Sequence, residues 1–287
     1  MTDDRAILAI DIGGTKTLVA LVDASGVVAE ATVPTERDDG PDRWLDAAFA
    51  AAQPWQGRFC GVGLAVTGFV RNGCWSAMNP ATLGIPENYP LIAKVEALFS
   101  TPAIAVNDAQ AAAWGEYAFG AGEGRDLVFL TISTGIGGGI VLNGRVLEGL
   151  AGHFGLTSDG DDDTFIEDRV SGRWMAAEAL RQGHTADARQ VFARATAGET
   201  WAMDIVAAST QRVARLCRNI QLALDPPRIV IGGGIGLAEG FVDRVRALMP
   251  PRGAVPPVEI CCAELGVRAG VLGVADMARI AFFAADR

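Results

Sequence analysis

Short apolar runs alternate with longer amphipathic stretches along most of the chain, and this pattern predicts an α/β protein. The first three runs are joined by short turns that contain Gly13-Gly14 and Ser25-Gly26, which predicts an antiparallel meander. Helical and strand-like spacing then alternate, and Asn107 and Asp108 end a strand directly before a helix. The strands expected in this part cover residues 7–14, 17–23, 27–33, 61–70 and 103–108, and the expected helices cover 41–52, 91–99 and 109–120.

The same order of elements restarts at residue 127, which suggests two related α/β halves. Strands are expected at 127–134, 139–144, 228–234 and 258–265, and helices at 164–181, 186–196, 201–224, 237–249 and 268–284. We therefore expect a smaller N-terminal domain, residues 1–118, and a larger C-terminal domain, residues 119–287. The closing helix, 268–284, is expected to pack back on the first domain.

Three of the strand-like runs end in glycine-rich turns, at 13–14, 135–139 and 232–234. A single such turn indicates little, because glycine is the usual residue of any tight turn. Three of them, each closing a buried strand, indicate backbone that a ligand approaches closely. Exposed backbone N–H groups bind phosphate well, so the pattern favours an enzyme that handles nucleotides.

Composition and charge narrow the choice of partners and compartment. The chain has 287 residues, half of them apolar, and a net charge of −10, which argues against nucleic acid as a partner. No uncharged apolar stretch approaches the roughly 18–20 residues that span a bilayer, and the N-terminus lacks the features of a signal peptide. Five cysteines without CxxC spacing are typical of buried thiols in a reducing compartment. We expect no membrane partner and a cytoplasmic location.

The motifs exclude two nucleotide-binding classes and resemble a third. Neither the P-loop pattern GxxxxGK[ST] nor a GxGxxG turn after a first strand is present. The chain instead resembles the ROK family of sugar kinases through DIGGTKT, STGIGGGIV, DPPRIVIGGGI and RAGVLGVADMA, at 11–17, 133–141, 225–235 and 268–278. This resemblance implies the actin/Hsp70/hexokinase-like (ribonuclease H-like) fold, with duplicated α/β domains around an interdomain cleft.

Within that family, the segments 66–70, 77–84, 107–122 and 149–155 resemble the bacterial members that phosphorylate N-acetylmannosamine. The resemblance implies transfer of a phosphoryl group from ATP, with Mg²⁺, to the 6-hydroxyl of N-acetyl-D-mannosamine. Another ROK hexokinase, for glucose, N-acetylglucosamine or fructose, is the alternative. A sugar-sensing regulator is a further alternative, but the family's repressors carry a helix-turn-helix, and only about six residues precede the first strand here. Dimers are common in such families, so a homodimer is one expectation for the assembly.

The resemblance gives Asp108 the role of general base, although a carboxylate at a helix start is also a common N-cap. Asn79, Asn107, His153 and Glu167 are expected to bind the sugar. Asparagine beside proline or at a strand end, histidine in a glycine-rich loop and glutamate in a first helical turn also have ordinary structural roles.

The nucleotide is expected to bind at the glycine turns. Asp11 would position Mg²⁺, through water. The residues expected to contact phosphates are Gly13, Gly14, Thr15, Lys16, Thr134, Gly135, Gly137 and Gly138, and those near the nucleoside are Gly233 and Gly234. For each glycine the alternative is a plain hairpin turn.

One departure from the family pattern concerns a metal. The family usually carries a zinc site of one histidine and three cysteines after the segment that contains His153. Here Leu156 stands at the histidine position, and residues 157–172 contain no cysteine. We therefore expect no structural zinc, and we hypothesise that apolar packing by Phe154, Leu156 and Phe165 takes its place. Coordinated loss of all ligands leaves no buried polar group without a partner.

Overall fold

The computed structural model describes residues 5–78, 83–158, 164–251 and 253–283. The chain divides into two compact units. Unit 1 comprises residues 1–118, 148–150 and 267–287, and unit 2 comprises residues 119–147 and 151–266. The short segment 148–150 and the C-terminal segment thus belong to unit 1, although both lie beyond residue 118.

The core of unit 1 is a five-stranded sheet with the order β3-β2-β1-β4-β7. Its strands are β1 (Ile7–Ile12), β2 (Lys16–Asp23), β3 (Gly26–Pro34), β4 (Val62–Val66) and β7 (Ala103–Asn107). The first three form an antiparallel meander, as the short turns predict, and β4 and β7 then add in parallel to β1. The parallel strands run toward one edge of the sheet.

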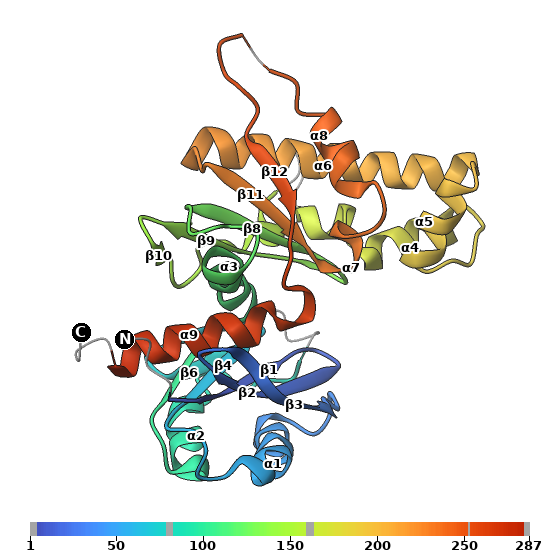
Figure 1. The fold of residues 1–287 in the computed structure, drawn as a ribbon. Coiled ribbons are helices and arrows are strands. Elements are labelled where there is room, and N and C mark those ends of the chain that lie inside the picture. Colours follow the sequence, from blue (N-terminus) through green and yellow to red (C-terminus); the bar gives the residue numbers. More distant parts are fainter. Residues whose placement is uncertain (1–4, 79–82, 159–163, 252, 284–287) are drawn as a thin grey trace. The chain divides into compact units, whose positions relative to one another are not determined.

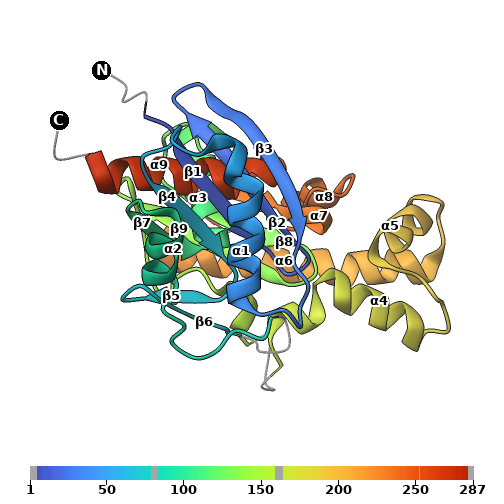
Figure 2. The ribbon, with the colours of Figure 1, turned by 90° about the horizontal axis from the view of Figure 1, so that it is seen from below.

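Side chains of β1 alternate between the two faces of this sheet, as the period of a strand requires. Leu8 and Ile10 pack with α1 (Pro41–Ala52) and α2 (Leu91–Phe99), whereas Ile7 and Ala9 pack with α9 (Ala269–Phe283). Figures 1 and 2 show the same layers, with α1 and α2 on one face of the sheet and α9 along the other. These contacts of β1 with three helices are all made within unit 1.

Glycine allows α9 to approach α3 (Asp108–Phe119) closely within unit 1. A Cβ atom on Gly273 would overlap the carbonyl oxygen of Ala111, and one on Gly115 would overlap that of Ala269. Trp114 Nε1 also donates a hydrogen bond to Asp276 Oδ2 at 2.8 Å. The position of α3 is therefore defined by backbone contacts with α9.

Unit 2 contains a second five-stranded sheet with the matching order β10-β9-β8-β11-β12. Its strands are β8 (Leu127–Ile132), β9 (Ile136–Leu142), β10 (Arg145–Val146), β11 (Arg228–Gly232) and β12 (Glu259–Cys262). β8, β9 and β10 pair antiparallel, and β11 and β12 add in parallel to β8, which repeats the arrangement of unit 1. This repetition confirms the duplicated α/β fold that the sequence predicts.

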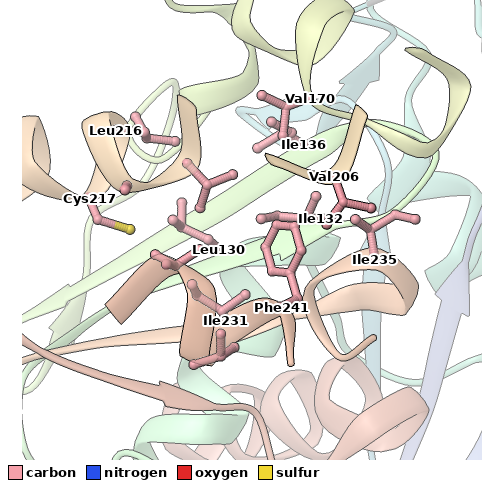
Figure 3. Packing of buried hydrophobic residues seen from close by; sticks show 14 of the residues in the cluster. Leu130, Ile132, Ile136, Val170, Val206, Leu216, Cys217, Ile231, Ile235 and Phe241 are labelled. Carbon is pink, nitrogen blue, oxygen red and sulfur yellow. The ribbon is translucent and has the colours of Figure 1, made fainter. Parts of the chain in front are cut away.

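The helices of unit 2 cover one face of its sheet with a continuous apolar core. They are α4 (Gly172–Arg181), α5 (Ala188–Thr196), α6 (Thr200–Leu224), α7 (Gly233–Gly236) and α8 (Phe241–Ala247). Figure 3 shows Phe241 at the centre of this core, near Ile132, Val206, Ile231 and Ile235. None of the helices in the described part of the chain has the length and apolar character needed to cross a bilayer.

Several expected elements differ in the structure, among them the strand expected at 228–234, whose last two residues lie in α7. The expected helix 164–181 is a 3₁₀ turn, η3 (Ile166–Arg169), followed by α4, whose N-cap Ser171 accepts from Trp174 N–H. The expected strand 61–70 ends at Val66, and β5 (Phe69–Arg71) forms a separate hairpin with β6 (Cys74–Ser76). The helix expected at 237–249 is shorter in the structure, because residues 237–240 form turns and α8 begins after Gly240, which has φ of 70°. Hydrophobic periodicity did not reveal these boundaries.

Candidate active site

The proposed catalytic residues of unit 1 lie at one edge of its sheet. In the parallel register, Ile12 lies opposite Val66, and Val66 lies opposite Asn107. The turn after β1, the turn after β4 and the start of α3 therefore come together at the carboxyl ends of three neighbouring strands. This edge is where open α/β sheets bind ligands.

Asn107 and Asp108 form the beginning of α3. Asn107 Oδ1 accepts hydrogen bonds from the N–H groups of Ala109 and Gln110, at 3.0 and 3.2 Å, which are the bonds of an N-cap residue. Asp108 is thus the first residue of the helix, and its Oδ1 accepts from Ala109 N–H at 2.8 Å. The N-cap of α3 is therefore Asn107 and not Asp108. The position of Asp108 at a helix N-terminus favours the charged form of its carboxylate.

Asp11 carries a second carboxylate at this edge. Although part of the residue is exposed, its carboxyl group has a pKa raised from 3.8 to about 7. Burial is the largest cause of this rise, the charge of Asp108 adds to it, and Lys16 partly offsets it. Gly270, in the first turn of α9, makes room for this carboxylate, because a Cβ atom there would lie 2.7 Å from Asp11 Oδ2. Two carboxylates and one ammonium group therefore influence one another electrostatically.

The turn between β1 and β2 is closed by backbone bonds. Gly13 N–H donates to Lys16 O at 3.1 Å, and Thr35 N–H donates to Thr15 O at 3.1 Å. The N–H of Gly13 is thus used within the hairpin. Gly14, Thr15 and Lys16 are exposed and are the residues of this turn that a phosphate could reach.

A side-chain hydrogen bond also connects the first turn of α3 to a later segment. Gln110 is buried, and its Nε2 donates to the carbonyl oxygen of Gly149 at 3.1 Å, which ties the segment 148–150 to α3 within unit 1. Asn79, expected to bind sugar, lies outside the described residues.

The glycine turns of unit 2 also lie at a single sheet edge. Thr131 of β8 lies opposite Gly232 of β11 in the parallel register. The turn that contains Thr134 and Gly135 follows β8, and Gly233 and Gly234 follow β11. Gly233 has φ of 83°, and a Cβ atom on it would overlap the carbonyl oxygen of Ile132, so this position requires glycine.

The glycines of β9 make room for the turn that carries His153. A Cβ atom on Gly138 would lie 2.7 Å from the carbonyl oxygen of Gly152, and Gly155 packs on the carbonyl oxygen of Ile136. His153 lies between Gly152 and the 3₁₀ turn η2 (Phe154–Leu156) and is half-buried. Gly138 therefore also shapes the position of the turn with His153, beyond its expected role toward phosphate.

Glu167 reaches the turn between β8 and β9. Ile136 N–H donates to Glu167 Oε2 at 3.4 Å, and a Cβ atom on Gly135 would lie 2.8 Å from the same oxygen. Glu167 Oε1 is also 3.7 Å from the Arg173 guanidinium. The structure thus places this expected sugar ligand directly beside an expected phosphate turn.

The hypothesis that three apolar residues replace the zinc site is partly wrong. Phe154 packs against the core of unit 2, and Leu156 is half-buried. The Phe165 side chain, however, is 44 % exposed, and its neighbour Ile166 is the one buried, at 4 %. Phe165 forms an isolated β-bridge with Ser158, and Ile166, the first residue of η3, is the one that packs into the core of unit 2.

We predict that this region holds its structure without metal. Purified protein should contain no stoichiometric zinc, and EDTA should leave its Tm unchanged, because Phe154 and Ile166 supply apolar packing. Metal analysis of the protein, with a family member that retains the cysteine motif as positive control, checks this. One tightly bound zinc per chain, or a large drop in Tm with EDTA, would contradict it.

Sequence reasoning missed three residues that hold the candidate site residues. They are Gly68, Gln110 and Arg173, which contact Asn107, the segment 148–150 and Glu167. The spacing Asn107-x-x-Gln110 is a known helix-start pattern and could have indicated the N-cap. Neither of the other two contacts has a local sequence signal, because each joins residues that the spacing rules do not relate.

The duplicated sheet and its strand-end glycine turns define the actin/hexokinase-like class of nucleotide-handling folds. The family model described as "ROK family" matches residues 7–280, and the chain belongs to this family.

Several relatives are sugar kinases by name. The chain is 41% identical over 284 residues to the N-acetylmannosamine kinase of Citrobacter koseri. This match covers 95% of the chain and 98% of that protein. It is 46% identical over 281 residues to the bifunctional enzyme NanE/NanK of Brucella melitensis, but this match covers 96% of the chain and only 54% of the relative. The chain thus spans about half the length of that bifunctional protein.

A solved structure supports the fold. A ROK family glucokinase from Streptomyces griseus, in complex with glucose and AMPPNP, has a TM-score of 0.80 and 27% identity. The match covers 96% of this chain and 99% of the glucokinase.

Proposed function

We propose that this protein is an ATP-dependent sugar kinase that transfers the γ-phosphoryl group to the 6-hydroxyl of N-acetyl-D-mannosamine. One observation carries the chemical part of the proposal. Asp108 begins α3 at the same sheet edge as the glycine turn after β1, and its charge is close enough to Asp11 to raise the pKa of that group. A base and a phosphate turn at one edge are what phosphoryl transfer to a hydroxyl requires.

Asp108 accepts the proton of the attacking hydroxyl in this proposal. The sugar oxygen forms a bond to the γ-phosphorus, the bond from that phosphorus to the ADP oxygen breaks, and the hydroxyl proton passes to the Asp108 carboxylate. The transition state is loose, so the hydroxyl gains little acidity until late in the step. A carboxylate held by Ala109 N–H suits this role because the hydrogen bond orients it and a helix N-terminus favours negative charge.

The residues around Asp11 fit a divalent cation. A buried carboxyl group with a second carboxylate nearby has a raised pKa, which means that positive charge is insufficient there. Asp11, through water, would hold Mg²⁺, and Lys16 would add a cation toward the phosphates. When bound, Mg²⁺ neutralises charge on the β- and γ-phosphates.

Sugar recognition is proposed for His153, Glu167, Asn107 and Asn79. His153 is held by the glycine surface of β9, and Glu167 is oriented by Ile136 N–H and Arg173. The preference for N-acetylmannosamine is supported by the relatives of that name at 39–41% identity over nearly their full length.

Turnover on a sugar panel tests the proposal. ADP release with MgATP is measured for N-acetylmannosamine, N-acetylglucosamine, glucose, mannose and fructose, against the background without sugar. We expect the highest kcat/KM on N-acetylmannosamine. A higher kcat/KM on another sugar would support the sugar-kinase activity but reject the proposed specificity for N-acetylmannosamine. No turnover on any sugar would reject the kinase and favour a sugar-binding sensor.

A further inference from the structure

The side-chain amide of Asn107 joins two separate segments of unit 1. Its Oδ1 accepts from Ala109 N–H and Gln110 N–H and so caps α3. Its Nδ2 donates to the carbonyl oxygen of Gly68 at 2.8 Å, and the residue is 7 % exposed. The first turn of α3 is thereby attached to the turn that follows β4.

The carbonyl group that receives this bond is itself held firmly. Gly68 has φ of 91°, and a Cβ atom there would lie 2.5 Å from the carbonyl oxygen of Ser76. The preceding Thr67 carbonyl accepts from Trp75 Nε1 at 2.7 Å, and Trp75 is fully buried. The β5–β6 hairpin therefore fixes the Gly68 carbonyl as an anchor.

These bonds limit what Asn107 can offer a ligand. A primary amide has two acceptor positions and two N–H donors. Both acceptor positions and one donor are used by Ala109, Gln110 and Gly68. At most one N–H remains for a sugar hydroxyl, and no acceptor does.

We propose that Asn107 is a positioning residue for Asp108. The two side chains share one donor, because Ala109 N–H lies 3.0 Å from Asn107 Oδ1 and 2.8 Å from Asp108 Oδ1. Asn107 thus sets the place of the amide that orients the carboxylate, and Gly68 sets the place of Asn107. The inference rests on the proposed function of Asp108 as general base, and it assigns the anchoring role to the Gly68 turn.

Two substitutions separate the cap from the anchor. Asn107→Ser retains an oxygen that can cap α3 but loses the donor to Gly68, whereas Asn107→Ala loses both. We expect kcat at saturating sugar to fall about 10-fold for the serine variant and about 100-fold for the alanine variant, because small misplacements of reacting groups have effects of this size. The Kd for the sugar, measured by calorimetry without nucleotide, should change less than about 3-fold, since at most one donor is lost.

Asp187→Ala provides a matched control. Asp187 caps α5 in unit 2 by accepting from Gln190 N–H at 2.8 Å, and it has no role in the proposed site. Loss of this cap should lower Tm to a similar extent as Asn107→Ala and leave kcat unchanged. A decrease in kcat through general destabilisation would appear in both variants.

A double-mutant cycle tests the route through Asp108. In an Asp108→Asn background, Asn107→Ser should lower the residual rate by less than about 2-fold, because there is no base left to position. Equal losses in both backgrounds would overturn the inference. The inference would also be overturned if kcat stayed intact and the sugar Kd weakened as much as kcat/KM fell. Asn107 would then be a sugar ligand only.

Amide hydrogen exchange distinguishes this inference from the proposed function. In the ligand-free protein, Asn107→Ser should accelerate exchange at Ala109 and Gln110, whereas Asp187→Ala should not. If the wild type phosphorylates no sugar but exchange increases in Asn107→Ser, the proposed kinase function is rejected and the anchoring role of Gly68 remains. If the wild type is an active kinase and neither exchange nor kcat changes in Asn107→Ser, the anchor is rejected alone.

Discussion

Asp108→Asn is expected to lower kcat for sugar phosphorylation by about 10²–10⁴-fold, the range typical of a lost general base. Asparagine has nearly the same shape as aspartate, and its amide oxygen can still accept the Ala109 N–H that holds Asp108 Oδ1. The helix cap is supplied by Asn107 and is unaffected. The fold should therefore persist while the acceptor for the hydroxyl proton is lost.

The measurement is steady-state ADP release with MgATP over a range of sugar concentrations. We expect the sugar KM to change little, because the loss belongs to the transition state. Asp204→Asn is the control, since it makes the same chemical change on an exposed face of α6. An Asp108→Asn protein with normal turnover would exclude Asp108 as the base.

The repeated order of elements was predictable because it is encoded locally. Residues 7–10 form a short continuous apolar run, which is typical of a strand buried on both faces and is visible in the printed chain without any partner. Glycine after a strand, as at Gly233, is visible in the same way. The resemblance of the motifs to the ROK family then predicted how these strands and helices assemble into two α/β domains.

Contacts between distant segments were not predictable. The bond from Asn107 to Gly68 joins residues 39 positions apart, and no spacing rule relates them. The burial of Ile166 rather than Phe165 occurs where a β-bridge to Ser158 meets η3, and periodicity cannot reveal this in so short a segment. Sequence reasoning therefore proposed residues for the chemistry, but it could not indicate which distant residues hold them in place.

Asp11→Asn is expected to stabilise the ligand-free protein at pH 8 while it lowers kinase activity. Burial and the nearby Asp108 charge raise the pKa of Asp11 from 3.8 to about 7 in the folded protein. Between these two values the folded state binds a proton that the unfolded state has released, so stability decreases as pH rises from about 4 to about 7. A difference of about 3 pKa units corresponds to about 4 kcal/mol above pH 7. Asparagine has no charge to bury and avoids this cost.

Thermal unfolding at pH 5 and pH 8, without nucleotide and Mg²⁺, measures the effect. The Tm of Asp11→Asn relative to wild type should rise between pH 5 and pH 8, and that of the exposed control Asp204→Asn should not. Mg²⁺ with a non-hydrolysable ATP analogue should then raise the wild-type Tm more than that of the variant, because binding stabilises only a folded state that retains the cation site. A variant that is less stable than wild type at pH 8 would show that the Asp11 carboxylate is not electrostatically strained. The cost of this carboxylate in the ligand-free fold thus comes first from its burial and second from the charge of Asp108, and a bound cation would offset both.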